Sequence, residues 1–209
     1  MARSKSSNAW LQRHVKDAYV RRAREEGFRS RAAYKLQEID ARERLLRGGG
    51  KVVDLGGAPG GWSQVAAAKV GPSGRVVAVD LLEIAPISGV TVLRGDFREP
   101  GVRATVRAAL GGPADVVLSD LSPNLSGIAA VDQANAAHLA GLAIEFGREV
   151  LKADGALLVK VFHGEAFEEV RAAMRAAFAS VVARKPEASR SESREAYLLA
   201  RAPQRRKSD

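Results

Sequence analysis

Short apolar runs alternate with longer amphipathic stretches along most of the chain. The early runs, such as Val76-Val77-Ala78-Val79, contain no alternating polar positions, which is typical of strands buried on both faces of a parallel sheet. The predicted strands are Lys51–Leu55, Arg75–Asp80, Val90–Arg94, Ala114–Asp120, Ala156–Val161, Val181–Arg184 and Ala196–Ala200. Predicted helices lie between most of them: Trp62–Val70, Glu99–Leu110, Ala134–Leu151 and Gly164–Ala179. This alternation predicts an α/β fold with a doubly wound, mostly parallel sheet.

The last two predicted strands are joined differently from the others. Only Lys185–Glu195 separates them, and this segment has no helical pattern. A parallel pair would need a longer crossover, so we expect an antiparallel terminal hairpin. A dinucleotide-binding fold would instead repeat strand–helix–strand units to its end. The hairpin therefore favours the Rossmann-like fold of methyltransferases that use S-adenosylmethionine (SAM), with seven strands.

Two helices are predicted before the first strand. An amphipathic helix at 9–25 is expected to lie on the domain or on a partner. A second helix at 31–46 begins after Ser30, a potential N-cap, and ends before Gly48-Gly49-Gly50. Lys35 precedes the apolar Leu36 by one position, or about 100° of helical rotation, which puts it at the edge of the buried side. We expect three parts: a basic extension at 1–29, a methyltransferase domain at 30–201 and a disordered basic tail at 202–209.

The charge is concentrated at the two ends of the chain. The chain has 209 residues and a net charge of +9. Residues 1–50 contain 13 Lys/Arg and 6 Asp/Glu, and the last nine residues contain 4 and 1. Basic ends on a near-neutral middle indicate a polyanionic partner, although Arg-rich ends could also serve only solubility. Charge alone does not distinguish RNA, DNA and an anionic membrane.

Composition excludes several other classes of protein. No apolar run approaches the ~20 residues that span a bilayer, and the first residues lack the apolar core of a signal peptide, so a cytoplasmic protein is expected. The chain has no cysteine, which excludes disulfides, thiolate zinc sites and a cysteine nucleophile. His14, His138 and His163 have no spacing typical of a metal site, so we interpret them as surface or structural residues and expect no metal.

A glycine-dense loop follows the first predicted strand. The sequence Asp54-Leu-Gly-Gly-Ala-Pro-Gly-Gly-Trp62 places this loop between a strand and a helix start, where backbone can approach a ligand closely. The dinucleotide fingerprint would need glycine at Ala58, and a phosphate-binding loop would need a Gly-Lys-Ser/Thr ending. An acid before the glycines suits a ligand with positive charge and no phosphate. SAM, with its ammonium and sulfonium groups, is such a ligand.

Acidic residues end the first four strands or closely follow them. They are Asp54, Asp80, Asp96 and Asp120. In parallel sheets the ligand lies across the carboxyl ends of the strands, so these acids should surround it. Asp80 occupies the position of an acid that binds ribose hydroxyls, and Asp96 could accept from an adenine amino group. One such acid could be a helix cap or turn residue, but four beside a glycine loop favour nucleoside binding.

Lys160 lies inside a predicted apolar strand, Ala156-Leu-Leu-Val-Lys-Val-Phe162. A buried lysine must be paired, neutral or at the ligand end of its strand, unless its stem reaches past the edge of the sheet. The functional interpretation is a base that desolvation and nearby positive charge make easier to deprotonate. Methylation of a ribose hydroxyl needs such a base, because a protonated hydroxyl is a poor nucleophile. Carbon methylation of pyrimidines commonly uses a cysteine, which this chain lacks.

Six blocks of sequence, in order and over nearly the whole chain from Ser30 to Ala200, carry a resemblance to a known family. They are Asp-Leu-Gly-Gly-Ala-Pro-Gly-Gly-Trp-Ser (54–63), Val-Asp-Leu-Leu (79–82), Gly-Asp-Phe-Arg (95–98), Ser-Asp-Leu-Ser-Pro-Asn-Leu-Ser-Gly (119–127), Val-Lys-Val-Phe (159–162) and Ser-Arg-Glu-Ala-Tyr (193–197). The chain resembles the FtsJ/RlmE ribosomal RNA 2'-O-ribose methyltransferases. Gly57 departs from the bacterial pattern, which has alanine there, and the smaller residue should not weaken SAM binding.

The resemblance implies specific roles. A Lys-Asp-Lys-Glu tetrad matches Lys35, Asp120, Lys160 and Glu195. Lys160 would take or steer the 2'-hydroxyl proton, Asp120 would hold Lys160, and Lys35 and Glu195 would orient the ribose. The matching cofactor positions are Gly60, Trp62, Asp80, Asp96 and Asp120. The resemblance also implies a monomer that methylates a uridine of 23S ribosomal RNA, in the large ribosomal subunit.

Three alternatives stay open from the sequence. Relatives with the same tetrad methylate transfer RNA or cap structures. The segment Ser119-Asp-Leu-Ser-Pro-Asn124 could be a degenerate loop of an adenine-N6 methyltransferase, but it lacks the aromatic that stacks on a flipped base. A non-catalytic RNA-binding or ribosome-assembly factor is the third, and an intact Lys160 with an intact glycine loop argues against it.

Overall fold

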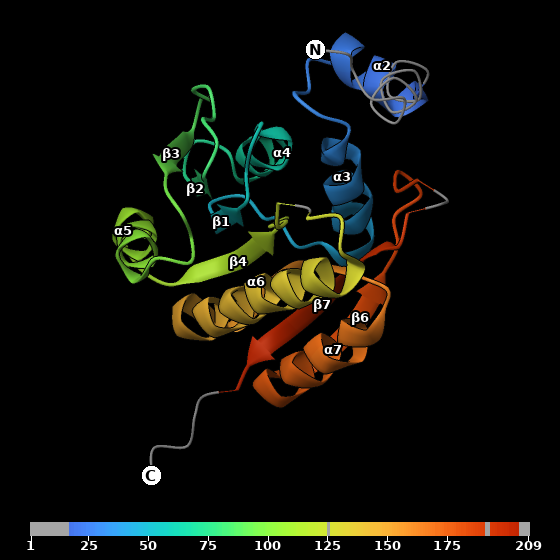
Figure 1. Ribbon diagram of the computed structural model, residues 1–209. Helices are drawn as coiled ribbons and strands as arrows, with labels where there is room; N and C mark the ends of the chain where they lie inside the picture. Colours follow the sequence, from blue (N-terminus) through green and yellow to red (C-terminus); the bar gives the residue numbers. More distant parts are fainter. Residues whose placement is uncertain (1–16, 125, 191–192, 205–209) are drawn as a thin grey trace.

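The fold is built on one seven-stranded sheet. The computed structural model describes residues 17–124, 126–190 and 193–204. The strand order is β3-β2-β1-β4-β5-β7-β6 (Figure 1). The strands are β1 (Lys51–Leu55), β2 (Arg75–Asp80), β3 (Val90–Arg94), β4 (Ala114–Ser119), β5 (Leu151–Phe162), β6 (Phe178–Arg184) and β7 (Glu195–Pro203). The helices are α2 (Ala18–Glu25), α3 (Ala32–Glu43), α4 (Gly61–Val70), α5 (Pro100–Leu110), α6 (Ala129–Val150) and α7 (Glu165–Ala177).

The pairing of the strands confirms the predicted topology. β1 pairs in parallel with β2 and β4, and β4 pairs in parallel with β5. β7 inserts between β5 and β6 and is antiparallel to both. The β6–β7 connection is shorter than the crossover that a parallel pair needs, so these two strands pair antiparallel. The fold is therefore the Rossmann-like α/β fold that the terminal hairpin predicts.

Helices cover both faces of the sheet, which explains the uninterrupted apolar runs (Figure 1). On one face, α3 and α4 pack through residues such as Leu36 and Val65 against Val52 and Leu118. On the other, α5, α6 and α7 pack on the side chains that alternate with these, such as Val53. The buried centre of the sheet thus lies between two apolar clusters, and polar groups gather at the strand ends. None of the described helices has the length and apolar character needed to cross a bilayer.

The helix α3 differs from its predicted boundaries at both ends. Ser30 does not cap it: the helix starts at Ala32 after Arg31, without a side-chain cap. Instead the Ser30 hydroxyl occupies the space beside Gly61, where a Cβ would lie 2.4 Å from it. At the other end Arg44 takes a left-handed conformation, and the Asp40 carboxylate accepts from the Leu46 amide at 2.8 Å. This side-chain bond ends the helix before the three glycines are reached.

The helix α2 lies on the domain. Of the predicted helix at 9–25, residues 9–16 are outside the described residues. Asp17 caps α2, accepting from the Tyr19 amide at 3.0 Å. Ala23 of α2 packs against Tyr34 of α3 and Ala188 of the β6–β7 loop. Asp17 also forms ion pairs with Arg31 and Arg190. These contacts hold α2 beside the β6–β7 loop.

Candidate active site

A cavity of about 570 Å³ opens at the carboxyl ends of the strands. It is lined by residues from the glycine loop, from the segments after β2, β3 and β4, and from the start of α6 and the end of β5. These are Gly56, Ala58, Val79, Asp80, Leu81, Leu82, Gly95, Asp96, Phe97, Arg98, Asp120, Leu121, Ser122, Pro123, Asn124, Asn135, His138, Leu139 and Lys160. The structure therefore brings Asp80, Asp96, Asp120 and Lys160 to one cavity. This is the crevice that parallel α/β sheets offer to ligands.

Asp80 organises two walls of this cavity. Its carboxylate accepts from the amide of Ala58 in the glycine loop at 3.0 Å and from the amide of Leu82 at 2.8 Å. Gly56 brings the glycine loop close to the next segment: its φ is +76°, and a Cβ there would lie 2.9 Å from the Leu121 backbone nitrogen. Only glycine fits this close approach, so the loop keeps its backbone exposed to the cavity.

Asp96 contributes a negative charge that is already paired. Arg98 binds both oxygens of this carboxylate: Nη2 donates to Oδ2 at 2.5 Å, and Nε donates to Oδ1 at 3.0 Å. The hydrogen bonds from the Arg98 side chain and backbone lower the pKa of Asp96. Both side chains line the cavity, so Asp96 is held ionised at its wall.

Gly60 and Trp62, at the end of the glycine loop, are not among the residues that line the cavity. Trp62 is 3% exposed, donates from its indole nitrogen to the Ala32 carbonyl at 2.8 Å, and packs on Tyr197 with ring centroids 5.6 Å apart. Gly60 has a φ of +117° and precedes α4. Their predicted contact with the cofactor stays a prediction, and in the structure both support the loop.

Asp54 is fully buried under the glycine loop. Its Oδ2 accepts from the Ser63 hydroxyl at 2.6 Å, and its Oδ1 has no hydrogen-bond partner among the described residues. Burial raises the pKa of Asp54 to about 7, against the opposing hydrogen bond from Ser63, and the negative charges of Asp120 and Asp80 raise it further. In the part of the chain that the structure describes, no cation forms an ion pair with this carboxyl group, so it holds a proton more tightly than an ordinary aspartate does.

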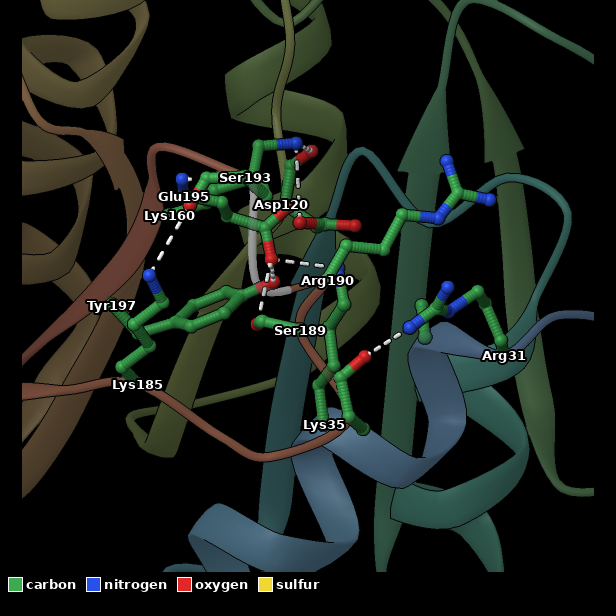
Figure 2. Close-up of polar contacts among 12 residues, drawn as sticks. Arg31, Lys35, Asp120, Lys160, Lys185, Ser189, Arg190, Ser193, Glu195 and Tyr197 are labelled. Atoms are coloured by element: carbon green, nitrogen blue, oxygen red, sulfur yellow. Dashed lines mark hydrogen bonds and ion pairs between the residues drawn. The ribbon is translucent and has the colours of Figure 1, made fainter. Parts of the chain in front are cut away.

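Lys160 reaches the cavity from β5. Its ammonium donates to the Asp120 backbone carbonyl at 2.8 Å and lies 3.1 Å from Asp120 Oδ1, an ion-pair distance without hydrogen-bond geometry (Figure 2). The Lys160 side chain is only 7% exposed. The buried lysine is thus paired, as the sequence requires, and it lies at the ligand end of its strand.

A second buried ion pair joins Lys35 of α3 to Glu195 of β7. Lys35 Nζ donates to Glu195 Oε1 at 2.6 Å, and the two side chains are 14% and 13% exposed. The same oxygen accepts from the Tyr197 hydroxyl at 2.9 Å and from the Ser189 hydroxyl at 3.3 Å. Burial alone would raise the pKa of Glu195, but the charge and hydrogen bond of Lys35, with the Tyr197 hydroxyl, lower it.

Strand register brings the two ion pairs together. In the β5–β7 pair, Lys160 lies opposite Tyr197, and Phe162 lies opposite Glu195. Side chains two residues apart share a face, so Lys160, Glu195 and Tyr197 converge on the side covered by α3, where Lys35 joins them (Figure 2). Burial raises the pKa of Tyr197 well above its ordinary value, and the charges of Asp120 and Glu195 raise it further. All four residues predicted as catalytic therefore form one polar cluster.

Sequence reasoning missed several residues of the site. Tyr197 could have been found, because it follows Glu195 by two positions on a strand and shares its face. Ser189 lies in a loop whose path no local pattern predicts. Asn135 and His138 line the cavity from α6, which begins five residues earlier than predicted. The exposed Leu81 and Leu82 also line it, although a strand-end pattern does not show which way such side chains point.

Comparison with known proteins identifies the class of enzyme to which this chain belongs. A family model described as FtsJ-like methyltransferase matches residues 28–202. The chain belongs to the FtsJ-like methyltransferase family and is therefore an enzyme of the methyltransferase class. It is 56% identical over 200 residues to "Ribosomal RNA large subunit methyltransferase E" of Nitrosospira multiformis, covering 95% of this chain and 97% of that one. The protein of the same name from Azoarcus sp. is also 56% identical, covering 95% and 98%.

Solved structures agree on the fold. A putative ribosomal RNA methyltransferase from Plasmodium falciparum superposes with a TM-score of 0.73 at 24% identity, covering 84% of this chain and 98% of that one. Fibrillarin from Aeropyrum pernix, solved with natively bound SAM, gives a TM-score of 0.56 at 18% identity, covering 81% and 73%. At these identities the likeness concerns the fold alone, and it confirms the Rossmann-like methyltransferase fold.

Proposed function

We propose that this protein transfers a methyl group from SAM to the ribose 2'-hydroxyl of a uridine in 23S ribosomal RNA, within the large ribosomal subunit, with Lys160 as the general base. The observation that carries the proposal is Lys160 itself. It is a lysine buried at the cavity wall, held by Asp120, and flanked by a second buried cation that is neutralised by Glu195. Such a site suits removal of a proton from a weakly acidic hydroxyl.

The cavity fits SAM as the cofactor. A volume of about 570 Å³ is in the range of small-molecule sites, and its walls combine glycine backbone, apolar Leu81 and Leu82, and carboxylates. Asp80 and Asp96 would bind the nucleoside half, and Asp120 would face the half that bears positive charge. When bound, SAM supplies a methyl group that a nucleophilic oxygen can attack. Gly60 and Trp62 would support the loop on which the cofactor lies.

The roles within the reaction follow from the two ion pairs. Neutral Lys160 would accept the 2'-hydroxyl proton at Nζ as the ribose oxygen bonds to the methyl carbon and the carbon–sulfur bond of SAM breaks. S-adenosylhomocysteine would be the leaving group. The Asp120 carbonyl and carboxylate fix the direction of Nζ, as they do in the structure. Lys35 would donate to a ribose oxygen, and Glu195, held ionised by Lys35 and Tyr197, keeps Lys35 in place. Two cations and two anions offset each other's burial.

The RNA substrate is supported by three features. The helix α2 is fixed through Asp17 to Arg190 of the β6–β7 loop, and Ser189 of that loop donates to Glu195 of the tetrad. The formal charge of the whole chain is +9, which favours a polyanion. The curated relatives of the same length are named for ribosomal RNA of the large subunit.

The product of the reaction tests the proposal. The purified protein is incubated with methyl-labelled SAM and with either large ribosomal subunits lacking the modification or transfer RNA, and the RNA is digested to nucleosides. We expect label only in 2'-O-methyluridine and only from the subunit. Label in transfer RNA alone would replace the ribosomal substrate, and label on a base or on protein would contradict ribose methylation altogether.

A further inference from the structure

Arg29, in the turn between α2 and α3, connects two segments that are far apart in the sequence. Its Nη1 donates to the Pro59 carbonyl at 3.2 Å and to the Ala85 carbonyl at 2.6 Å. Its Nη2 donates to the Pro86 carbonyl at 2.7 Å. Pro59 belongs to the glycine loop, whereas Ala85 and Pro86 belong to the segment between β2 and β3. One guanidinium therefore bridges both segments.

The position of Arg29 is itself fixed by α4. The Arg29 amide donates to the Gln64 side-chain oxygen at 2.9 Å, and the Gln64 side-chain nitrogen donates to the Gly27 carbonyl at 3.0 Å. The side chain of Arg29 then passes over Gly60: a Cβ added at Gly60 would lie 3.1 Å from Arg29 Cδ and 2.6 Å from Ile87 Cδ1. Hydrogen bonds therefore fix both the backbone amide and the guanidinium of Arg29.

The bridged segments are the two walls that Asp80 joins on the cavity side. Ala58 lines the cavity from the glycine loop, and Leu81 and Leu82 line it from the other segment. Asp80 links these walls from within, through the amides of Ala58 and Leu82. Arg29 links them from outside through three carbonyls. Two charged groups of opposite sign thus hold the same pair of walls from opposite sides.

We propose that Arg29 is a positioning residue for the cofactor: it sets the separation of the glycine loop and the β2–β3 segment, and thereby the affinity of the cavity for SAM. This inference rests on the proposed function, because it takes SAM to be the ligand of the cavity. Arg29 acts through the two walls and does not line the cavity itself. Both Nη atoms of Arg29 donate to backbone carbonyls of the protein. A surface arginine that binds RNA phosphates would instead direct these atoms to the solvent.

The choice between these two roles can be made by one conservative change. Arg29→Lys keeps the positive charge, but a single ammonium cannot reproduce the planar fork that reaches three carbonyls on two segments. Arg29→Ala removes both charge and fork. A role in holding the walls therefore predicts that the two variants behave alike, whereas a role in binding phosphate predicts that Arg29→Lys behaves like the wild type.

The experiment measures binding of S-adenosylhomocysteine by calorimetry, together with KM for SAM, KM for RNA and kcat. We expect both variants to bind S-adenosylhomocysteine on the order of tenfold more weakly, the loss expected when charge-assisted hydrogen bonds are removed. KM for SAM should rise in parallel, with kcat at saturating SAM and KM for RNA nearly unchanged. Arg75→Ala is the matched control, because Arg75 donates to the Ala109 carbonyl at 3.0 Å away from the cavity; its affinity should be that of the wild type.

Each other outcome overturns the inference in a recognisable way. Wild-type affinity in Arg29→Lys refutes it, and a rise only in KM for RNA reassigns Arg29 to the substrate. A lower kcat with unchanged KM for SAM indicates a merely structural role, through a smaller folded fraction. If Arg29→Ala does not fold, as judged by circular dichroism, Arg29→Lys decides alone. Absence of S-adenosylhomocysteine binding by the wild type would refute the proposed function as well, which distinguishes that failure from the others.

Discussion

Two carboxyl groups at the same edge of the sheet, Asp54 and Glu195, differ in their charged neighbours and in the direction of their pKa shifts. Asp54, under the glycine loop, has a hydroxyl as its hydrogen-bond partner and a pKa raised to about 7. Glu195, in the polar cluster, has Lys35 at 2.6 Å and a lowered pKa. On the proposed function, the cofactor half contains an acid that pairs with no cation among the described residues, and the reaction half contains paired cations and anions.

The difference indicates what each half does. A carboxyl group without a cation is costly to ionise when buried, so it favours a ligand that brings positive charge. Paired charges cost less, and they can orient a neutral hydroxyl and receive its proton. The same chemical group, a carboxyl, thus has a different role in each half because its neighbours differ. Variants that remove or exchange those neighbours can test this contrast.

The largest effect is expected from Lys160→Ala, which removes the proposed base from the reaction half. The rate of methyl transfer should fall by roughly 10²- to 10⁴-fold, the usual contribution of general acid–base catalysis, while RNA binding is kept. Single-turnover assays with labelled SAM and filter binding measure the two quantities. Lys152→Ala is the control: Lys152 pairs with Asp115 at 2.6 Å at the opposite edge of the sheet. A Lys160 variant with the parent rate would exclude Lys160 as the base.

The cofactor half is tested by the pH dependence of folding stability. Because the folded state raises the pKa of Asp54 from 3.8 to about 7, it binds a proton that the unfolded state releases. Stability from this group is complete below the unfolded pKa and is lost as pH rises to about 7, by on the order of 4 kcal/mol. Asp54→Asn cannot titrate, so urea unfolding of the apoprotein should show a flatter pH profile. Parallel profiles would contradict an unpaired Asp54.

In the same measurement, Glu195→Gln should reveal a pH dependence of stability opposite to that of Asp54. The lowered pKa of Glu195 means that its stabilisation is present above the unfolded pKa and is lost as pH falls through the folded pKa. The difference in stability between wild type and Glu195→Gln should therefore shrink on acidification. If the difference in unfolding free energy between wild type and variant changed with pH in the same direction for Asp54→Asn and Glu195→Gln, the contrast between the two halves would be wrong.

The strength of the reaction-half pair is measured by a double-mutant cycle of Lys35→Met and Glu195→Gln. Both side chains are nearly buried, so we expect a coupling energy of about 2 kcal/mol in unfolding free energy. The control cycle uses Arg22 and Glu26 of α2, whose side chains are 57% and 40% exposed, and should show almost no coupling. Equal coupling energies in both cycles would show that burial does not strengthen the Lys35–Glu195 ion pair.

The smallest effect is expected from Tyr197→Phe. The hydroxyl donor to Glu195 is lost while the ring keeps its packing on Trp62, which costs about 1 kcal/mol of stability and slows methyl transfer only a few-fold. Tyr34→Phe loses a comparable bond, to Glu26 at 3.0 Å, away from the site. Its rate should equal that of the wild type. If both variants were slowed equally, Tyr197 would have no specific link to the site.

Most of the secondary structure followed from local pattern. The boundaries of β1, β2 and β3 match their predicted limits, because each is a short run rich in β-branched residues that begins directly after a glycine. Predictions were weaker where side chains compete with the backbone. The end of α3 depends on Asp40 reaching the Leu46 amide, and the start depends on the Ser30 hydroxyl fitting beside Gly61 instead of capping the helix.

The amino-acid sequence by itself determined the succession of strands and helices along the chain, the antiparallel terminal hairpin and the acids at the strand ends. Hydrophobic period and connection length act over a few residues, so a local pattern shows them. It also named the four residues of the tetrad through a resemblance. Only the tertiary structure decided that Lys35 meets Glu195, which is 160 positions away, and that Arg29 spans two walls of the cavity. Such contacts depend on strand register and on helix packing across the sheet, which no local pattern encodes.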